Sequence, residues 1–351
     1  MENLIIESSN WLRSDQCSKG SIQDRTQGVL GHFKKYLRRN KDELESLTGK
    51  PINYLVNDVV VCQTVFGAII SAYLRGVHHI AVTSAHSFVK EITIGILPKG
   101  ARLYKARVAE SNYLFSQDEM FHIPYEKRNK IGNQRFSVSG LPCLYLGSSS
   151  YICWEELGRV DFSACNFCGF TNISDVDLYD LALPVSISSA SDIKRICLIL
   201  ACSLSAKRED LFKEEYILPQ CIFQALILRH HYYHSNKKTF GIKYFSAHVL
   251  NGDADCFKID FSDSNWNKRF INYVFPAAST ENSGFSSLLK SVFNQSETTT
   301  MMIETLLSPD KLVSGRSNDV YLDSQFGLMD AYLDERMGYK PLRREATFLT
   351  I

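Results

Sequence analysis

LYKARV at residues 103–108 and NQRFSVSGLPCLYLGSSSYICWEELGR at residues 133–159 form the stretch of this 351-residue sequence that decides its fold. In the second part, Gly140 and Pro142 are typical of a turn, and the apolar run CLYL that follows them is typical of a strand. Three serines at residues 148–150 then offer side chains that cap the N-terminus of a helix. The sequence therefore predicts a turn, a strand and, directly after it, a helix.

The polar residues of this stretch follow a definite order along the chain. Basic side chains come first at Lys105, Arg107 and Arg135, aromatic side chains follow, and two carboxylates close the stretch. Cations hold phosphate groups, and a carboxylate stabilises positive charge that develops on a sugar. The order therefore predicts an anionic nucleotide as ligand, with Glu155 and Glu156 in the first or second turn of the helix.

Three blocks of the sequence resemble the RES domain family, which is named for an Arg, a Glu and a Ser. They are LPKGARLYKAR at residues 97–107, QRFSVSGLPCLYLGSSSYICWEE at residues 134–156 and GIKYFS at residues 241–246, in the order that the family shows. The resemblance covers residues 92–280. It implies a fold similar to ADP-ribosyltransferase toxins and an activity that breaks down NAD, in many members as the toxin of a toxin–antitoxin pair.

The resemblance implies catalytic roles for Glu156, Tyr145 and Ser246. Glu156 lies eleven positions after Tyr145, as the family's Glu does after its Tyr, and would engage the nicotinamide ribose. A carboxylate there stabilises an oxocarbenium-like transition state, as in glycoside cleavage. Tyr145 would stack on a ring of the nucleotide or donate its hydroxyl, and Ser246 would bond a ribose or a phosphate. Glu155 stays an alternative, because a one-residue gap would exchange the two carboxylates.

The resemblance also implies that three cations, Lys105, Arg107 and Arg135, hold the pyrophosphate of NAD. Lys105 departs from the family, which has an Arg at this position. Arg offers phosphate a planar fork, whereas Lys offers a point charge. Positions 105 and 107 face the same side of a strand, so either residue, or both, can reach one phosphate. Because of this departure, a catalytically degenerate domain that binds nucleotide or a partner without turnover stays an alternative.

The composition of the whole chain is that of a globular protein. The hydrophobic fraction is 45%, the charged fraction is 22%, and a net charge of +1 gives no case for nucleic acid or a membrane surface as partner. The N-terminus lacks a signal-peptide pattern, so the 10 Cys predict free thiols and a cytoplasmic location. The apolar window at residues 54–74 contains two carboxamides and Asp58, which favours a buried helix over a membrane span.

The pattern changes along the chain and predicts three parts. Residues 1–91 read as a helical N-terminal module, residues 92–280 as the RES-like catalytic domain, and residues 281–351 as a C-terminal tail of linker and helices. Alternating short strands and helices predict the α+β class, with a mixed sheet core. The polar segment 111–134 suits a substrate lid. Because the candidate site residues lie beyond residue 91, we expect the N-terminal module to set oligomerisation or to recruit a regulator. Alternatively, its helices complete the core of the catalytic domain.

The function that the resemblance implies is cleavage of the nicotinamide–ribose bond of NAD, by hydrolysis or phosphorolysis, in a growth-arresting toxin or defence effector. Transfer of ADP-ribose to a protein is an alternative, as is nucleotide binding without turnover. The expected partners are NAD, an antitoxin or regulatory protein, and further copies of the chain. We expect NAD as substrate and no metal, since the CxxC pair Cys165 and Cys168 has no second pair at zinc spacing.

Overall fold

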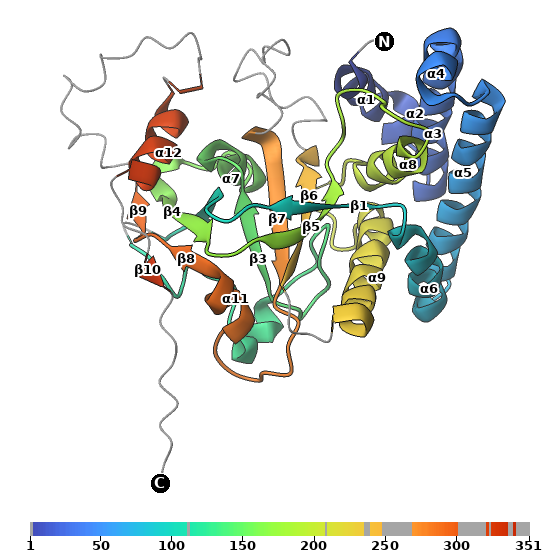
Figure 1. Ribbon diagram of the computed structural model, residues 1–351. Coiled ribbons are helices and arrows are strands. Elements are labelled where there is room, and N and C mark those ends of the chain that lie inside the picture. The colour runs from blue at the N-terminus through green and yellow to red at the C-terminus, as the bar shows by residue number, and fades with distance from the viewer. Residues whose placement is uncertain are drawn as a thin grey trace.

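In the part of the chain that the structure describes, ten strands form one sheet at the centre of the fold (Figure 1). The structure is a computed structural model that describes residues 3–110, 113–207, 209–234, 239–247, 269–300, 321–322, 324–335 and 340–341. The strands are β1 Thr93–Leu97, β2 Arg102–Val108, β3 Cys143–Gly147, β4 Cys165–Asn172, β5 Val176–Leu181, β6 Phe240–Phe245, β7 Ile271–Pro276, β8 Phe293–Gln295, β9 Thr299–Thr300 and β10 Lys340–Pro341.

The strands lie in the order β1-β5-β6-β7-β3-β2-β4-β8-β10, with β9 paired to β4. β5 and β6 run parallel, whereas the other described pairs run antiparallel. Helices lie mainly before the sheet in the chain and between its strands, with α11 and α12 near the end. The prediction of an α+β fold with a mixed sheet is therefore confirmed.

The sheet is nearly divided between β2 and β3. β2 pairs with β4 from Arg102 to Val108, and β3 pairs with β7 from Cys143 to Gly147. Between β2 and β3, however, the single paired position is Tyr104 opposite Gly147. Backbone groups of the two strands are therefore not joined to one another beyond that position, and side chains from both strands line one cavity.

The predicted strand and helix at residues 143–156 are confirmed. β3 ends at Gly147, and α7 (Ser150–Glu156) begins two residues later. The hydroxyl of Ser149 accepts a hydrogen bond from the N–H of Ile152 at 3.2 Å, which caps the helix. Gly147 is needed for this tight passage, because a Cβ there would lie 2.5 Å from Ile152 Cγ2. Glu156 becomes the last residue of α7, at the cavity end.

Gly147→Ala is expected to lower the free energy of unfolding by about 1–3 kcal/mol, the usual cost of overpacking. The added methyl would also lie 2.7 Å from Cys153 Sγ, so α7 must shift. Urea denaturation measures the change. Gly31→Ala in α3 (Ile22–Arg39) is the control, because nothing lies within 4 Å of its Cβ, and we expect unchanged or increased stability. Equal stability of both variants would contradict the steric argument.

Residues 4–89 form six helices, as expected for the N-terminal part. The hydroxyl of Ser21 accepts the N–H of Asp24 at 3.2 Å and thereby begins the long helix α3. α5 follows Pro51, a residue suited to the start of a helix. The bounds are α1 Leu4–Leu12, α2 Asp15–Ser18, α3 Ile22–Arg39, α4 Lys41–Thr48, α5 Ile52–Leu74 and α6 His78–Val89.

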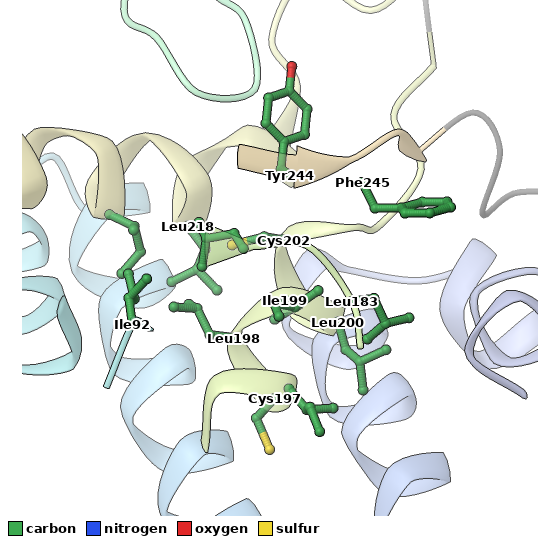
Figure 2. Packing of buried hydrophobic residues seen from close by; sticks show 14 of the residues in the cluster. Ile92, Leu183, Cys197, Leu198, Ile199, Leu200, Cys202, Leu218, Tyr244 and Phe245 are labelled. Atoms are coloured by element: carbon green, nitrogen blue, oxygen red, sulfur yellow. The ribbon is translucent and has the colours of Figure 1, made fainter. Parts of the chain in front are cut away.

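The N-terminal helices share a hydrophobic core with the elements that follow β1. α3 and α5 pack against α8 (Asp192–Cys202), and α5 and α6 pack against α9 (Ile217–His234). One cluster of buried side chains contains Phe33 and Phe66 from these helices together with Ile199, Leu218 and Phe245. Figure 2 shows the α8, α9 and β6 members of this cluster side by side. The shared core favours the alternative that the N-terminal helices complete the core, while the three-part division stays a prediction.

α5 combines burial with a strongly apolar composition. The helix is long and apolar enough to cross a membrane, by length and composition alone, and 44% of its apolar window is buried inside the structure. Core helices of other proteins satisfy the same criterion. Its buried side chains, such as Leu55, Val59 and Phe66, recur at helical spacing, which is how a helix presents one face to a core.

The C-terminal part contributes strands as well as helices, which corrects the expectation of a linker followed by helices. The Ser/Thr-rich residues 286–300 form α11 (Ser287–Val292), β8 and β9, and both strands pair with β4. The apolar residues 326–333 lie in α12 (Gln325–Glu335), as predicted. The apolar residues 301–307, also read as helical, lie outside the described residues.

α12 packs against α7, the helix that ends at Glu156. Asp330 accepts a hydrogen bond from the N–H of Ser150 at 2.9 Å, and Tyr321 donates to the same carboxylate at 2.6 Å. Asp334 accepts from Tyr104 at 2.9 Å, which ties α12 to β2 as well. The C-terminal helix therefore fixes α7 against the sheet.

Candidate functional site

A cavity of about 980 Å³ opens where β2 and β3 diverge. The predicted site residues Lys105, Arg107, Arg135, Tyr145 and Glu156 all lie in its wall. Residues 113–134, the described part of the segment 111–134 expected as a lid, form another part of the wall and contain the short 3-10 helix η1 (Tyr125–Lys130). The structure thus brings together five of the six predicted site residues in one concave surface.

Glu156 is held by two hydrogen-bond donors. Its Oε1 accepts from Ser246 Oγ at 2.8 Å and from Asn272 Nδ2 at 2.6 Å. Ser246 directly follows β6 and Asn272 lies in β7, so two strands converge on the end of α7. A carboxylate fixed in this way keeps its orientation when charge develops near it.

Ser246 and Asn272 differ in how they reach the cavity. Ser246 is fully buried and does not line the cavity, and in this structure its hydroxyl orients the Glu156 carboxylate, while its contact with a ribose or phosphate stays a prediction. Asn272 does line the cavity, and the sequence analysis missed it. The signal that could have found it is an amide within the apolar run INYVF of residues 271–275.

Glu155, the alternative carboxylate, points into the protein. It is 3% exposed, and it accepts hydrogen bonds from Tyr151 Oη at 2.5 Å and from Arg159 Nε at 2.8 Å. It takes no part in the cavity wall. The geometry therefore favours Glu156 for any chemistry in the cavity and gives Glu155 a role in anchoring α7.

Lys105 and Arg107 extend from the same side of β2, as the strand period requires. Lys105 Nζ donates to the carbonyl of Phe121 at 2.5 Å, and Arg107 donates to the carbonyl of Glu119. The Arg107 guanidinium also lies 4.1 Å from the centre of the Phe115 ring. Burial lowers the pKa of the Lys105 ammonium to about 8. Both cations thus hold the wall segment in place while facing the cavity.

Arg135 reaches the cavity from the turn that precedes β3. Its Nη1 donates to the carbonyl of Cys202 at 2.6 Å and to that of Leu204 at 3.1 Å. The guanidinium lies 5.1 Å from the centre of the Tyr216 ring, which is itself part of the wall. The carbonyls at the end of α8 are a favourable place for a cation. Arg135 is therefore oriented by the end of α8 and by an aromatic ring.

Tyr145 brings a buried hydroxyl to the wall. By geometry, neither its hydroxyl nor that of Ser137, another wall residue, makes a hydrogen bond among the described residues. Burial raises the pKa of Tyr145 well above its usual value, although Ser137 lies close enough to lower this pKa slightly, so the phenol is neutral. Tyr216 and Tyr244 line the same cavity. The site therefore offers aromatic faces together with hydroxyl groups that can donate to a ligand.

His122 in the wall segment is held as a neutral imidazole. Its Nε2 accepts the N–H of Ser286 at 2.9 Å, so Nδ1 carries the proton and donates to the carbonyl of Ile123 at 2.8 Å. Burial lowers the pKa of His122 to about 4. Both ring nitrogens are thus used within the protein, and His122 supports the wall.

Cys165 and Cys168 lie on β4 with both thiols buried. Three positions on a strand turn two side chains to opposite faces, so one ion cannot readily meet both. Among the described residues, no group of three His, Cys, Asp or Glu side chains could hold a metal ion. Burial raises the pKa of these thiols, to about 11 for Cys165 and about 12 for Cys168.

Comparison with known proteins gives a relative from Bacillus subtilis (strain 168) named "Putative toxin YopC". The two sequences are 33% identical over 217 residues, an alignment that covers 56% of this chain and 45% of the relative. The chain thus spans less than half the length of the relative it matches. No family model matches the chain, and no solved structure matches it. The likeness to the RES family therefore rests on the three sequence blocks.

Proposed function

We propose that this protein is an NAD-degrading enzyme that cleaves the bond between nicotinamide and ribose. The observation that carries the proposal is the Glu156 carboxylate, which two donors hold in a cavity lined by Lys105, Arg107 and Arg135. A fixed anion beside several cations suits a substrate with an anionic pyrophosphate and a reacting sugar that becomes positive. The resemblance to the RES family supports the same substrate.

Cleavage breaks the bond from ribose C1′ to the pyridine nitrogen. The electron pair of the bond leaves with nicotinamide, which becomes neutral, and the positive charge moves to C1′ and the ring oxygen of the ribose. The Glu156 carboxylate stabilises that charge. Hydrogen bonds from Ser246 and Asn272 keep the carboxylate in its orientation. Water then attacks C1′ and releases one proton, giving ADP-ribose; phosphate as acceptor gives the phosphate ester.

The remaining residues bind and orient NAD in this proposal. Lys105, Arg107 and Arg135 pair with the pyrophosphate. The ring of Tyr145 lies against a base, and its hydroxyl donates to the nucleotide. The cavity walls around these side chains reduce their exposure to bulk water, which strengthens each charge interaction.

The biological role that we propose is growth arrest through loss of NAD, as a toxin or defence effector. The name of the Bacillus subtilis relative, "Putative toxin YopC", supports this role. An antitoxin or regulatory protein that neutralises the activity, and assembly of several copies of the chain, belong to the same proposal.

The test is incubation of the purified chain with NAD, followed by chromatography of the products. We expect release of nicotinamide with an equal amount of ADP-ribose, or of its phosphate ester in phosphate buffer. Transfer of label from the adenosine part of NAD to protein would favour an ADP-ribosyltransferase. NAD binding without nicotinamide release would favour a degenerate domain, an alternative that the Lys at position 105 supports.

Lys105→Ala is expected to raise KM for NAD roughly tenfold or more, with a smaller change in kcat, because a charge-assisted contact to phosphate is lost. Lys105→Arg is expected to maintain or lower KM. The Lys105 ammonium, with a pKa of about 8, is charged below that pH and loses its charge as the pH rises through it.

The pH dependence of KM distinguishes these variants. KM of the parent protein should rise between about pH 7 and pH 9, whereas the guanidinium of Lys105→Arg stays charged and should keep KM level. Identical profiles for parent and Lys105→Arg would show that Lys105 does not hold the substrate. If Arg107→Ala alone then raised KM, Arg107 would be the phosphate cation.

A further inference from the structure

The middle of the segment that joins α8 to α9 is weakly supported by packing. Leu211 is 100% exposed and Phe212 is 52% exposed, although both are large apolar residues. The segment nevertheless ends in the 3-10 helix η3 (Glu214–Tyr216), and Tyr216 lines the cavity. The ends of this segment are held by the buried side chains of Leu204 and Ile217 together with polar contacts.

Arg135 is the cavity residue that depends on this segment. The carbonyls of Cys202 and Leu204, which accept from its guanidinium, lie at the first end of the segment. The Tyr216 ring, 5.1 Å from the guanidinium, lies at the second end. The direction of the Arg135 side chain is thus set by both ends together.

Arg25 of α3 joins the same two ends from the N-terminal helices. Its Nη2 donates to the carbonyl of Ser205 at 2.6 Å, and its Nη1 pairs with the carboxylate of Glu215. Its Nε donates to the carbonyl of Cys17 at 2.8 Å, which fixes the guanidinium to its own helices. Both side chains of the ion pair are buried, with 10% and 8% exposure. The planar guanidinium of Arg25 therefore joins the two ends of the exposed segment.

We infer that Arg25 is a positioning residue for Arg135, so that the N-terminal helices set the affinity of the cavity for the pyrophosphate of its substrate. Ser205 follows Leu204 directly, and Glu215 precedes Tyr216 directly. Each group that Arg25 holds is thus the chain neighbour of a group that orients Arg135. The inference rests on the proposed function for the identity of the substrate, and on the contacts alone for the link between the two arginines.

A purely stabilising role for Arg25 would leave the cavity unchanged in the folded protein. Buried ion pairs add little net stability, since the cost of desolvating both charges offsets their attraction. A guanidinium that bonds a carboxylate and a carbonyl at the same time does, however, fix their relative positions. A Lys side chain cannot make this pair of contacts. The two roles therefore predict different effects on KM. Loss of a positioning contact changes KM, whereas loss of stability alone does not.

The experiment uses the full chain with Arg25→Lys, which keeps the charge beside Glu215 and loses the fork. We expect a severalfold rise in KM for NAD with kcat nearly unchanged, smaller than the roughly tenfold or greater rise for Arg135→Ala. In the Arg135→Ala background, Arg25→Lys should raise KM no further, because the residue through which it acts is absent. A second variant, Arg25→Met with Glu215→Leu, removes both charges if the single change impairs folding.

Lys194→Met is the matched control. Lys194 Nζ lies 3.6 Å from Asp58 Oδ1, so this ion pair also joins α8 to the N-terminal helices, but at the start of α8, remote from residue 202. KM should not change in this variant. No change with Arg25→Lys, or an equal rise in the presence and absence of Arg135, would overturn the inference.

Hydrogen exchange separates failure of the inference from failure of the proposed function. Arg25→Lys should speed exchange of the backbone amides in residues 209–216, with or without NAD, and Lys194→Met should not. A parent chain that neither binds nor cleaves NAD would refute the proposed function. Unchanged exchange in Arg25→Lys would refute the link between Arg25 and the cavity whatever the substrate is.

Discussion

Glu156→Gln is expected to slow NAD cleavage by at least about a hundredfold, the usual cost of losing one group that stabilises charge in a transition state. Gln keeps the size of Glu and an oxygen that can accept the hydrogen bonds from Ser246 and Asn272. The fold and NAD binding should therefore persist while the negative charge is lost. Nicotinamide release measures the rate, and calorimetric titration with NAD measures binding.

Glu155→Gln is the matched control for this prediction. Glu155 is buried and bonded to Tyr151 and Arg159, so the change should lower the free energy of unfolding by about 1–3 kcal/mol. The folded variant should still cleave NAD at nearly the parent rate. A fully active Glu156→Gln beside a folded but inactive Glu155→Gln would transfer the catalytic role to Glu155.

The sequence predicted the strand and the helix that carry Glu156 because both signals are local. An apolar run, Gly147 and the capping serines lie within a few positions of one another. Asn272 could not be found in this way. It reaches Glu156 through the pairing of β3 with β7, which places it opposite Gly147, and such register is a property of the whole sheet.

The C-terminal strands show why composition misled the sequence analysis. Residues near 296–300 are rich in Ser and Thr and read as a linker, yet they pair with the edge of β4. Ser296 donates its N–H to the carbonyl of Gly169 and accepts the N–H of that residue through its hydroxyl, both at 2.9 Å. Backbone groups at a sheet edge need partners whatever the side chains are, so weak strand propensity did not prevent pairing.

Removal of residues 1–91 is expected to prevent folding of the remaining chain. The deletion strips α3, α5 and α6 from α8 and α9, and exposes side chains such as Ile199 and Leu218. Each large apolar side chain that loses its burial costs about 1.5–3 kcal/mol, and several such losses exceed the total of about 5–15 kcal/mol that a protein has. The shortened chain should be insoluble or lack a cooperative urea transition.

Two single substitutions in α5 test the same argument in the full chain. Phe66 is fully buried, with its ring 5.0 Å from that of Phe88, so Phe66→Ala should lower the free energy of unfolding by about 3–5 kcal/mol. Tyr54 is 55% exposed on the same helix, so Tyr54→Ala should change it by no more than about 0.5 kcal/mol. A soluble protein lacking residues 1–91 that still cleaves NAD would show instead that the helices form a separate module. Its escape from a neutralising partner, or a different oligomeric size, would then establish the regulatory role that the sequence suggested.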